Sequence, residues 1–309
     1  MPPAPATPVV ALVRASLDRR AVAATIGVLL LYAVSVLTPF GQLLGDLILT
    51  GRPTEDPDRI AAARDVLGVV SVTTLALAGL AIAAIAVLRR RPWLAIAVLV
   101  AIVGANLTTQ VLKRLVLPRP NLTPDLPQVY LNSYPSGHAT VVAVLALALL
   151  VVVPARLRPP VALVGVIGFA LTGTSTIIAG WHRMEDVVGA GLVALAWVAA
   201  AAALVVRRRG AVPVADHHRT GHRVAGRALV VGALVVGVLG LLAWGQVFVE
   251  GDEIIAALDA GTASAQRLFA GAAVITVAAA IATVATLWRA IRRGEIERPG
   301  RRLRARGAR

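Results

Sequence analysis

The chain lacks cysteine entirely, and it contains few aromatic and few charged residues. The absence of cysteine excludes disulfides, thiolate metal ligands and a cysteine nucleophile. Aromatic residues make up only 4% of the chain, which argues against stacking platforms for single-stranded nucleic acid. Charged residues make up 15%, whereas soluble domains contain about 25%. Because 58% of the residues are hydrophobic, the composition favours a protein whose solvent is a lipid bilayer.

The charge is strongly unbalanced, with 31 basic against 16 acidic residues and a net charge of +15. Such an excess is also typical of nucleic-acid-binding proteins. Here, however, the arginines gather in the short gaps between apolar runs and in the C-terminal tail, as they do at the cytoplasmic ends of membrane spans. We therefore expect no nucleic-acid partner, and we expect the basic gaps to contact anionic lipid headgroups.

Eight apolar runs are long enough to cross a hydrocarbon core of about 30 Å, which takes roughly 20 residues of helix. They cover residues 22–44, 66–88, 93–117, 137–155, 160–180, 186–206, 228–249 and 265–288. The sequence therefore predicts an all-α, polytopic membrane helical bundle. Its expected segments are a disordered basic N-terminal segment (1–20), a six-helix membrane core (21–206), a basic cytoplasmic loop (207–227), a C-terminal transmembrane helix pair (228–288) and a basic cytoplasmic tail (289–309).

The charges of the gaps also predict a topology in the cell membrane. If the arginine-rich gaps are cytoplasmic, both termini lie inside and four loops lie outside. Only the gap at 118–136 departs from this pattern, because basic residues lie beside it on the outer side. Three polar clusters fall on that side. Ionisable groups in or beside membrane helices are costly, so each cluster is a candidate functional site.

The first cluster is "LKRLVLPRP", which ends the third span with Lys113, Arg114 and Arg119. Lysine and arginine at a helix end also extend to lipid headgroups without any further function. Alternatively, Arg119 offers a planar fork that binds an oxyanion through two hydrogen bonds, and Lys113 adds a point charge.

The second cluster is "YPSGHAT" at the start of the fourth span. Pro135 and Gly137 permit a tight turn, and Ser136 is a good N-cap for the helix that contains His138. A helix N-terminus offers unpaired N–H groups and the positive end of a dipole, which suit a phosphate. The simpler interpretation is a capped helix start without a ligand.

The third cluster is "TSTIIAGWHRMED", residues 174–186. His182 and Asp186 are four residues apart, so on a helix they would share one face. An aspartate bonded to one imidazole nitrogen fixes the tautomer and leaves the other nitrogen available as base or nucleophile. The alternative is a structural His–Asp pair.

The three clusters together contain the groups needed for phosphoryl transfer without a metal or another cofactor. Cations and a helix N-terminus bind the phosphate, one histidine held by an aspartate attacks, and a second histidine protonates the leaving group.

In this order and spacing, the clusters resemble the three-part signature of the type-2 phosphatidic acid phosphatase superfamily, over roughly residues 66–206. Members include membrane lipid phosphate phosphatases. The resemblance implies His182 as nucleophile, Asp186 as its orienting partner and His138 as general acid and then base. It also implies a phosphate-binding set, namely Lys113, Arg119, Ser136, Gly137 and Ser175.

Two features depart from the family pattern. Five residues separate Lys113 from Arg119, where the family usually has six. The third motif opens with Ser175 and Thr176 where the family has Ser-Arg, so one phosphate-binding cation is missing. Arg183 and Arg114 are candidate replacements, and Thr176 is a candidate hydrogen-bond donor. We expect weaker or altered binding of the phosphate rather than a loss of activity.

The function expected from these residues is hydrolysis of a lipid phosphate or diphosphate at the outer membrane face. Polyprenyl diphosphate, phosphatidic acid and phosphatidylglycerophosphate are candidate substrates, and a polyprenyl diphosphate fits an outward-facing site best. A lipid-phosphate transferase on the same fold remains an alternative, because an alcohol can replace water. A transporter or scaffold with a vestigial pocket is another.

Three further histidines, His217, His218 and His222, fall in the basic loop. A metal site is one interpretation, but histidines without a nearby carboxylate geometry are more often solvated. We therefore expect no metal there. The sequence leaves the oligomeric state open, and it does not decide what the C-terminal helix pair does.

Overall fold

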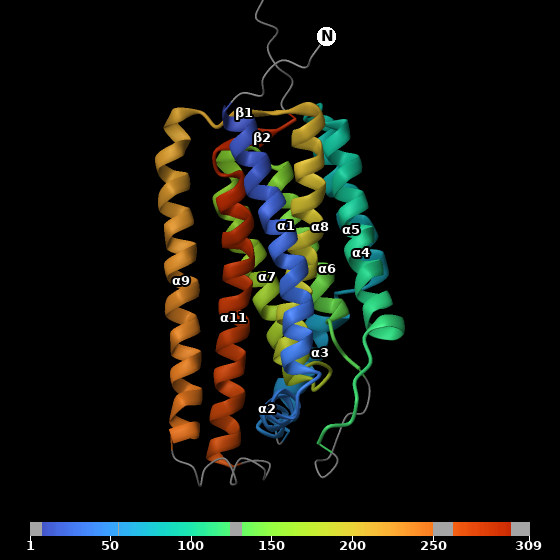
Figure 1. Cartoon of the computed structure of the whole chain (residues 1–309), viewed down its shortest axis with the longest axis vertical. Coiled ribbons are helices and arrows are strands. Elements are labelled where there is room, and N and C mark those ends of the chain that lie inside the picture. Colours follow the sequence, from blue (N-terminus) through green and yellow to red (C-terminus); the bar gives the residue numbers. More distant parts are fainter. Residues whose placement is uncertain (1–7, 55, 124–131, 250–261, 298–309) are drawn as a thin grey trace, which may run out of the picture.

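The computed structural model describes residues 8–54, 56–123, 132–249 and 262–297. Within these ranges, ten α-helices run mostly along one long axis, and the all-α bundle predicted from the sequence is confirmed (Figure 1). The α-helices are α1 (Pro8–Ser35), α2 (Pro39–Thr50), α3 (Pro57–Gly68), α4 (Val72–Leu88), α5 (Pro92–Val111), α6 (Gly137–Val152), α7 (Arg158–Ile178), α8 (Met184–Arg209), α9 (Asp216–Val249) and α11 (Ala263–Ile291). A π-helical turn (Leu112–Val116) extends α5, a 3₁₀ turn (Ala155–Leu157) precedes α7, and two short strands are β1 (Ala211–Pro213) and β2 (Gly294–Ile296).

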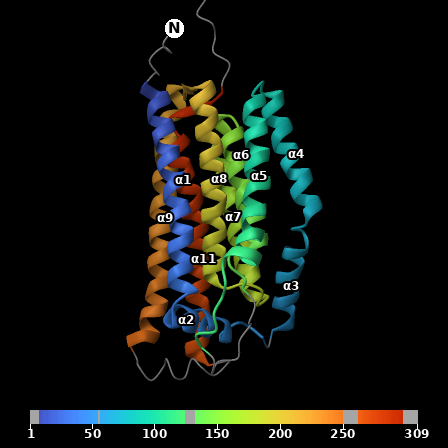
Figure 2. The ribbon, with the colours of Figure 1, turned by 45° about the vertical axis from the view of Figure 1, so that its right-hand side comes forward.

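The helices account for the eight predicted spans. Five are long and apolar enough to cross a membrane, namely α5 with its π-helical turn, α7, α8, α9 and α11. Two more candidates are bent pairs, with α1 and α2 at 84° and α3 and α4 at 49° (Figure 2). The remaining apolar helix, α6, is shorter. The fold is therefore that of a multi-pass membrane protein.

The first span differs from its predicted bounds. Helix α1 begins at Pro8, so residues 8–20, predicted to be disordered, are helical instead. Its buried positions, which fall on one face against α8, are Val13, Leu17, Ala24, Val28 and Tyr32. The span ends at Ser35 rather than at residue 44, because Thr38 caps a new helix that starts at Pro39.

Helix α8 lies at the centre of the bundle. It packs against α1, α5, α6 and α11, and its buried positions are mostly alanine, valine and glycine. At Gly189, a Cβ atom would lie 2.5 Å from the ring of Tyr134, so only glycine allows this close approach. The Tyr134 hydroxyl donates to the Val28 carbonyl over 2.7 Å. This packing fixes the segment that leads into α6.

The C-terminal helix pair does not form a separate unit. Helix α11 packs against α1, α2, α7 and α8, whereas α9 lies outside it and packs mainly on α11 (Figure 1). The predicted loop at 207–227 is also largely ordered into regular structure. Its first residues end α8, its middle forms β1, and α9 starts at Asp216.

The end of the bundle that holds β1 and β2, called here the basic end, is fastened by the residues after α11. The strands pair antiparallel, with Ala211 opposite Ile296. The Glu297 carboxylate accepts from the backbone N–H groups of Trp93 and Leu94, and so caps α5. His222, predicted to be solvated, is buried, and its ring nitrogens face the carbonyls of Ala155 and Arg292.

Candidate active site

The histidine–aspartate pair of the third motif lies at the opposite end of the bundle, called here the site end. His182 Nδ1 is 3.1 Å from Asp186 Oδ2, and Asp186 is completely buried. The sequence suggested that one helix would carry both residues. Instead, His182 lies in the loop before α8, and Gly180, with a φ of 71°, is in the turn after α7. The Arg183 N–H also donates to Asp186 Oδ2 over 2.9 Å.

The start of α6 is joined directly to this pair. Ser136 is the N-cap residue of α6, as the sequence predicts, and its Oγ accepts from the Ala139 N–H. The Ser136 N–H donates to the backbone carbonyl of Asp186 over 2.9 Å. The second and third motifs are therefore held together by a backbone hydrogen bond, which places the first turn of α6, with Gly137, beside the His182–Asp186 pair.

The second histidine and the lysine lie near the His182–Asp186 pair. The His138 ring lies 5.4 Å from the ring of Trp181, the neighbour of His182 in the chain. His138 is close enough to His182 and to Lys113 for their charges to interact. Lys113 is the only lysine in the chain, and it sits on the π-helical turn after α5. The structure thus brings both histidines and the single lysine together at the site end.

Arg119 is the cation with unmet hydrogen-bonding capacity. Its side chain is only 5% exposed, and its nearest ion-pair contact is Asp46 Oδ1 at 3.9 Å. Its Nη1 and Nη2 atoms are buried without a hydrogen-bond partner among the described residues. Burial and the neighbouring Arg183 lower the pKa of Arg119, while Asp46 opposes that shift. A buried guanidinium in this state is suited to an anionic ligand.

The candidate auxiliary residues are Arg183, Thr176 and Arg114, and the contacts of the first two do not leave them open to a phosphate. Arg183 is 2% exposed, and its Nε and Nη2 both donate to Asp46 Oδ1. The buried Thr176 hydroxyl donates to the Gly173 carbonyl of its own helix, so it is not offered to a ligand. Arg114 is exposed. Ser175 is buried within α7, next to the loop that carries His182.

Helix α2 contributes residues that sequence reasoning missed. Gln42 and Asp46, both buried, are four residues apart on one face of this helix. Gln42 Nε2 donates to the Pro120 carbonyl over 2.7 Å, and its Oε1 accepts from the Leu122 N–H over 3.2 Å. The Tyr32 hydroxyl bonds to the Pro118 carbonyl. The signal that could have found them is an aspartate and a glutamine within the apolar stretch "FGQLLGDLIL".

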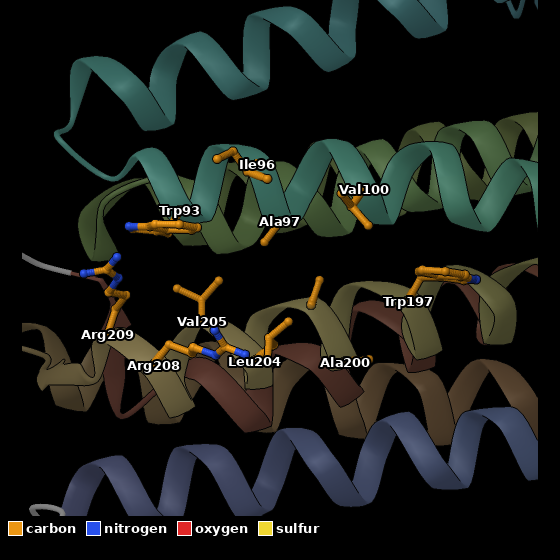
Figure 3. A pocket seen from close by; sticks show the side chains of 11 residues that line it. Trp93, Ile96, Ala97, Val100, Trp197, Ala200, Leu204, Val205, Arg208 and Arg209 are labelled. Carbon is orange, nitrogen blue, oxygen red and sulfur yellow. The ribbon is translucent and has the colours of Figure 1, made fainter. Parts of the chain in front are cut away.

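An apolar groove runs along the bundle between α5 and α8 (Figure 3). Its volume is about 470 Å³, and Trp93, Arg208 and Arg209 lie at one end with Trp197 at the other. A second groove of about 420 Å³ shares Trp197 with the first and is also lined by Leu112, the residue before Lys113. Trp197 and Ala200 line both grooves, and along α5 the two linings extend from Trp93 at the basic end to Leu112 toward the site end.

The fold and the site define a polytopic helical membrane protein with a buried ionisable site at one end of its bundle. Residues 93–210 match the family model described as the PAP2 superfamily. The resemblance inferred from the motifs is therefore confirmed over the segment from α5 to α8, which contains every candidate site residue, and the match suggests a phosphatase-type fold. No curated protein and no solved structure matches the chain.

Proposed function

We propose that the protein is an integral-membrane lipid phosphatase that works through a phosphohistidine intermediate. The observation that carries this proposal is the buried His182–Asp186 pair beside the guanidinium of Arg119, whose terminal nitrogens have no hydrogen-bond partner among the described residues. A nucleophile with an orienting carboxylate and an open cationic site are the two parts that phosphoryl transfer needs. The excess of arginine at the basic end supports a cytoplasmic position for that end, and so an outward-facing site in the cell membrane.

In the first step, Asp186 accepts the Nδ1–H of His182, so that Nε2 of His182 carries the lone pair. This nitrogen attacks the terminal phosphorus, a P–N bond forms, and the P–O bond to the leaving group breaks. The leaving group is the lipid alcohol of a monophosphate or the lipid monophosphate of a diphosphate. His138, protonated at the start, gives its proton to the departing oxygen. Lys113 and Arg119 compensate the negative charge that the phosphoryl oxygens carry in the transition state.

In the second step, the now neutral His138 takes a proton from water, and the water oxygen attacks the phosphorus. The P–N bond breaks, inorganic phosphate leaves, and His182 and the protonated His138 are restored. These steps require no metal or other cofactor. Gly137 and the first turn of α6 would add backbone donors to the phosphate site.

The length of the adjoining grooves supports a long-chain substrate. On α5 they extend from Trp93 to Leu112, which corresponds to about 28 Å at about 1.5 Å per helical residue. One leaflet supplies only about half of the roughly 30 Å hydrocarbon core. The acyl chains of a phospholipid would fill part of the groove, whereas a polyprenyl chain could fill it all. We therefore favour a polyprenyl diphosphate over phosphatidic acid and phosphatidylglycerophosphate.

The test is phosphate release by the purified protein from these three lipids. We expect release to be fastest with the polyprenyl diphosphate and to be abolished in His182→Ala. The matched control is His217→Ala, which removes an exposed histidine at the basic end and should release phosphate like the wild type. Release that survives His182→Ala, or no release from any of the lipids, would contradict the proposal. Added chelator should leave the rate unchanged.

A further inference from the structure

A second polar cavity lies at the basic end, remote from the catalytic histidines. Its volume is about 410 Å³, and it is formed by the first turns of α1, the start of α9 and the chain after α11. The lining consists of Val9, Leu12, Arg219, His222, Arg223, Arg292 and Arg293. Four arginines and a histidine thus meet two apolar side chains, and no carboxylate belongs to the described lining.

Ion pairs and hydrogen bonds within the protein satisfy the arginines of this cavity only in part. Arg219 pairs with the exposed Asp216 at 2.7 Å. Arg292 Nε is buried without a hydrogen-bond partner among the described residues. Burial, followed by the neighbouring arginines Arg293, Arg289 and Arg223, lowers the pKa of Arg292. Like charges held this close together repel one another, and an anion bound between them would relieve that repulsion.

Backbone hydrogen bonds and the paired strands β1 and β2 frame the cavity. The Val214 N–H donates to the Arg293 carbonyl over 3.1 Å, beside the paired strands β1 and β2. Trp288 Nε1 donates to the His222 carbonyl, and the buried His222 ring faces the carbonyl of Arg292. These contacts hold the arginine backbones in place before any ligand arrives, which reduces the ordering cost of binding.

We propose that this cavity binds a phosphate oxyanion, with the phosphate of an anionic phospholipid headgroup as the favoured ligand and free phosphate as the other source. Arginine forks match the geometry of phosphate oxygens. Val9 and Leu12 provide an apolar side for the part of a lipid that adjoins its headgroup. The site lies outside residues 93–210 and does not depend on the phosphatase proposal.

The experiment measures thermal unfolding of the purified full chain in detergent against increasing concentrations of three probes. These are a short-chain phosphatidylglycerol, inorganic phosphate and, as reference, a short-chain phosphatidylcholine. A ligand that binds the folded state raises the unfolding midpoint in a saturable way. Arg292→Gln/Arg293→Gln removes two charges from the cavity. The matched control, Arg156→Gln/Arg207→Gln, removes two exposed charges that do not line it.

We expect phosphatidylglycerol to give a saturable shift and phosphatidylcholine none. An arginine near an anionic headgroup contributes about fivefold in affinity, so the cavity variant should need about 25-fold more lipid for half-saturation, as about fivefold per charge implies. The lipid concentration at half-saturation of the control variant should stay within about twofold of the wild-type value, because its two changed charges do not touch the ligand. Saturation by inorganic phosphate that the cavity variant weakens would equally support the site and would identify the free anion as sufficient.

No saturable shift with either anion would overturn the proposal, as would equal weakening in the two double variants. If the cavity variant does not fold, the single change Arg293→Gln at an exposed position replaces it. Its expected effect is about fivefold, and an unchanged half-saturation would then count against the site.

Discussion

Both ends of the bundle bury charged side chains, but they meet those charges differently. At the basic end, Glu295 Oε1 accepts from the Ala155 N–H over 2.8 Å, and Oε2 lies 2.9 Å from Arg91 Nη2. Arg158, also buried, donates to the carbonyls of Ile291 and Gly294. At the site end, neither terminal nitrogen of Arg119 has a hydrogen-bond partner among the described residues.

The difference separates the Glu295 cluster, which is structural, from the cluster around Arg119, which is suited to binding. Two nitrogens of Arg91 also lack a hydrogen-bond partner among the described residues, but its Nη2 is held by a carboxylate whose two oxygens are both bound. A buried charge that the protein itself satisfies contributes to folding, and removing its partner is costly. A buried donor left open is costly to the folded protein but is ready to bind a ligand. Changes at the two ends should therefore affect different properties.

The largest effect is expected from Asp186→Asn at the site end. The amide cannot accept the Nδ1–H of His182 as a carboxylate does, so the imidazole would favour the wrong tautomer. A comparable change in the catalytic triad of serine proteases lowers kcat by about 10⁴-fold, and we expect a loss of about 10³- to 10⁴-fold in phosphate release. Asp65→Asn, which changes an exposed aspartate of α3, is the control. A loss under tenfold would contradict the orienting role.

The next effect is expected from Arg119→Gln. The terminal nitrogens of Arg119 have no hydrogen-bond partner among the described residues, and Asp46, 3.9 Å from Nη2, keeps its hydrogen bonds from Arg183. Their removal should therefore leave the thermal stability unchanged or slightly raised. Phosphate release should fall by about 10²- to 10³-fold in kcat/KM, the usual cost of losing one donor to a developing oxyanion. Arg114→Gln removes the same charge from an exposed position five residues earlier and serves as the control. Equal losses in both variants would show that Arg119 acts only through general electrostatics.

At the basic end, Glu295→Gln should reverse this pattern. The change leaves Arg91 and Arg158 buried without a carboxylate, and breaking a buried ion pair typically costs about 3–5 kcal/mol of stability. We expect a lower unfolding temperature in detergent, with unchanged KM at temperatures where the variant is folded. Asp18→Asn, which removes an exposed partner of Arg14, should shift the temperature little. Unaltered stability in Glu295→Gln would show that the Glu295 carboxylate does not stabilise the folded protein, and the expected contrast between the two ends would be lost.

The sequence predicts local features of the site better than distant ones. The Ser136 cap and the His182–Asp186 spacing depend on neighbours within four residues, and both contacts are present in the structure. The pairing of Arg183 with Asp46 joins residues 137 positions apart through a helix that lies across the bundle. No periodicity in the chain carries that information. The sequence therefore makes Arg183 a candidate phosphate ligand, whereas in the structure its Nε donates to Asp46 of α2.

The bounds of the spans show the same contrast between features that local sequence predicts and features that depend on distant contacts. Apolar length places the bounds of α5, α6, α7, α8 and α11 within a few residues, because bilayer thickness determines it. Helices α1 and α9 begin well before the spans expected for them. It does not determine where a long apolar stretch bends, and the stretch around Ser35 and Pro39 turns by 84° where a single span was expected. Likewise, the burial of His222 depends on α11 and on the chain after it, which return to the basic end far from that histidine in sequence.

The smallest expected effect is a dependence of stability on pH that originates at the basic end. Burial alone would raise the pKa of Glu295, but the Ala155 N–H, Arg91 and Arg158 together hold it below the usual value of a glutamate. A carboxyl group whose pKa is lowered by folding stabilises the protein above the unfolded-state pKa of about 4.3, and this contribution is lost as the pH falls through the lower folded-state value. The unfolding temperature of the wild type should therefore fall between neutral pH and this acidic range. In Glu295→Gln that part of the slope should be absent, whereas Arg119→Gln should keep it. Parallel slopes in the wild type and in Glu295→Gln would mean that the buried carboxylate of the basic end does not control acid stability.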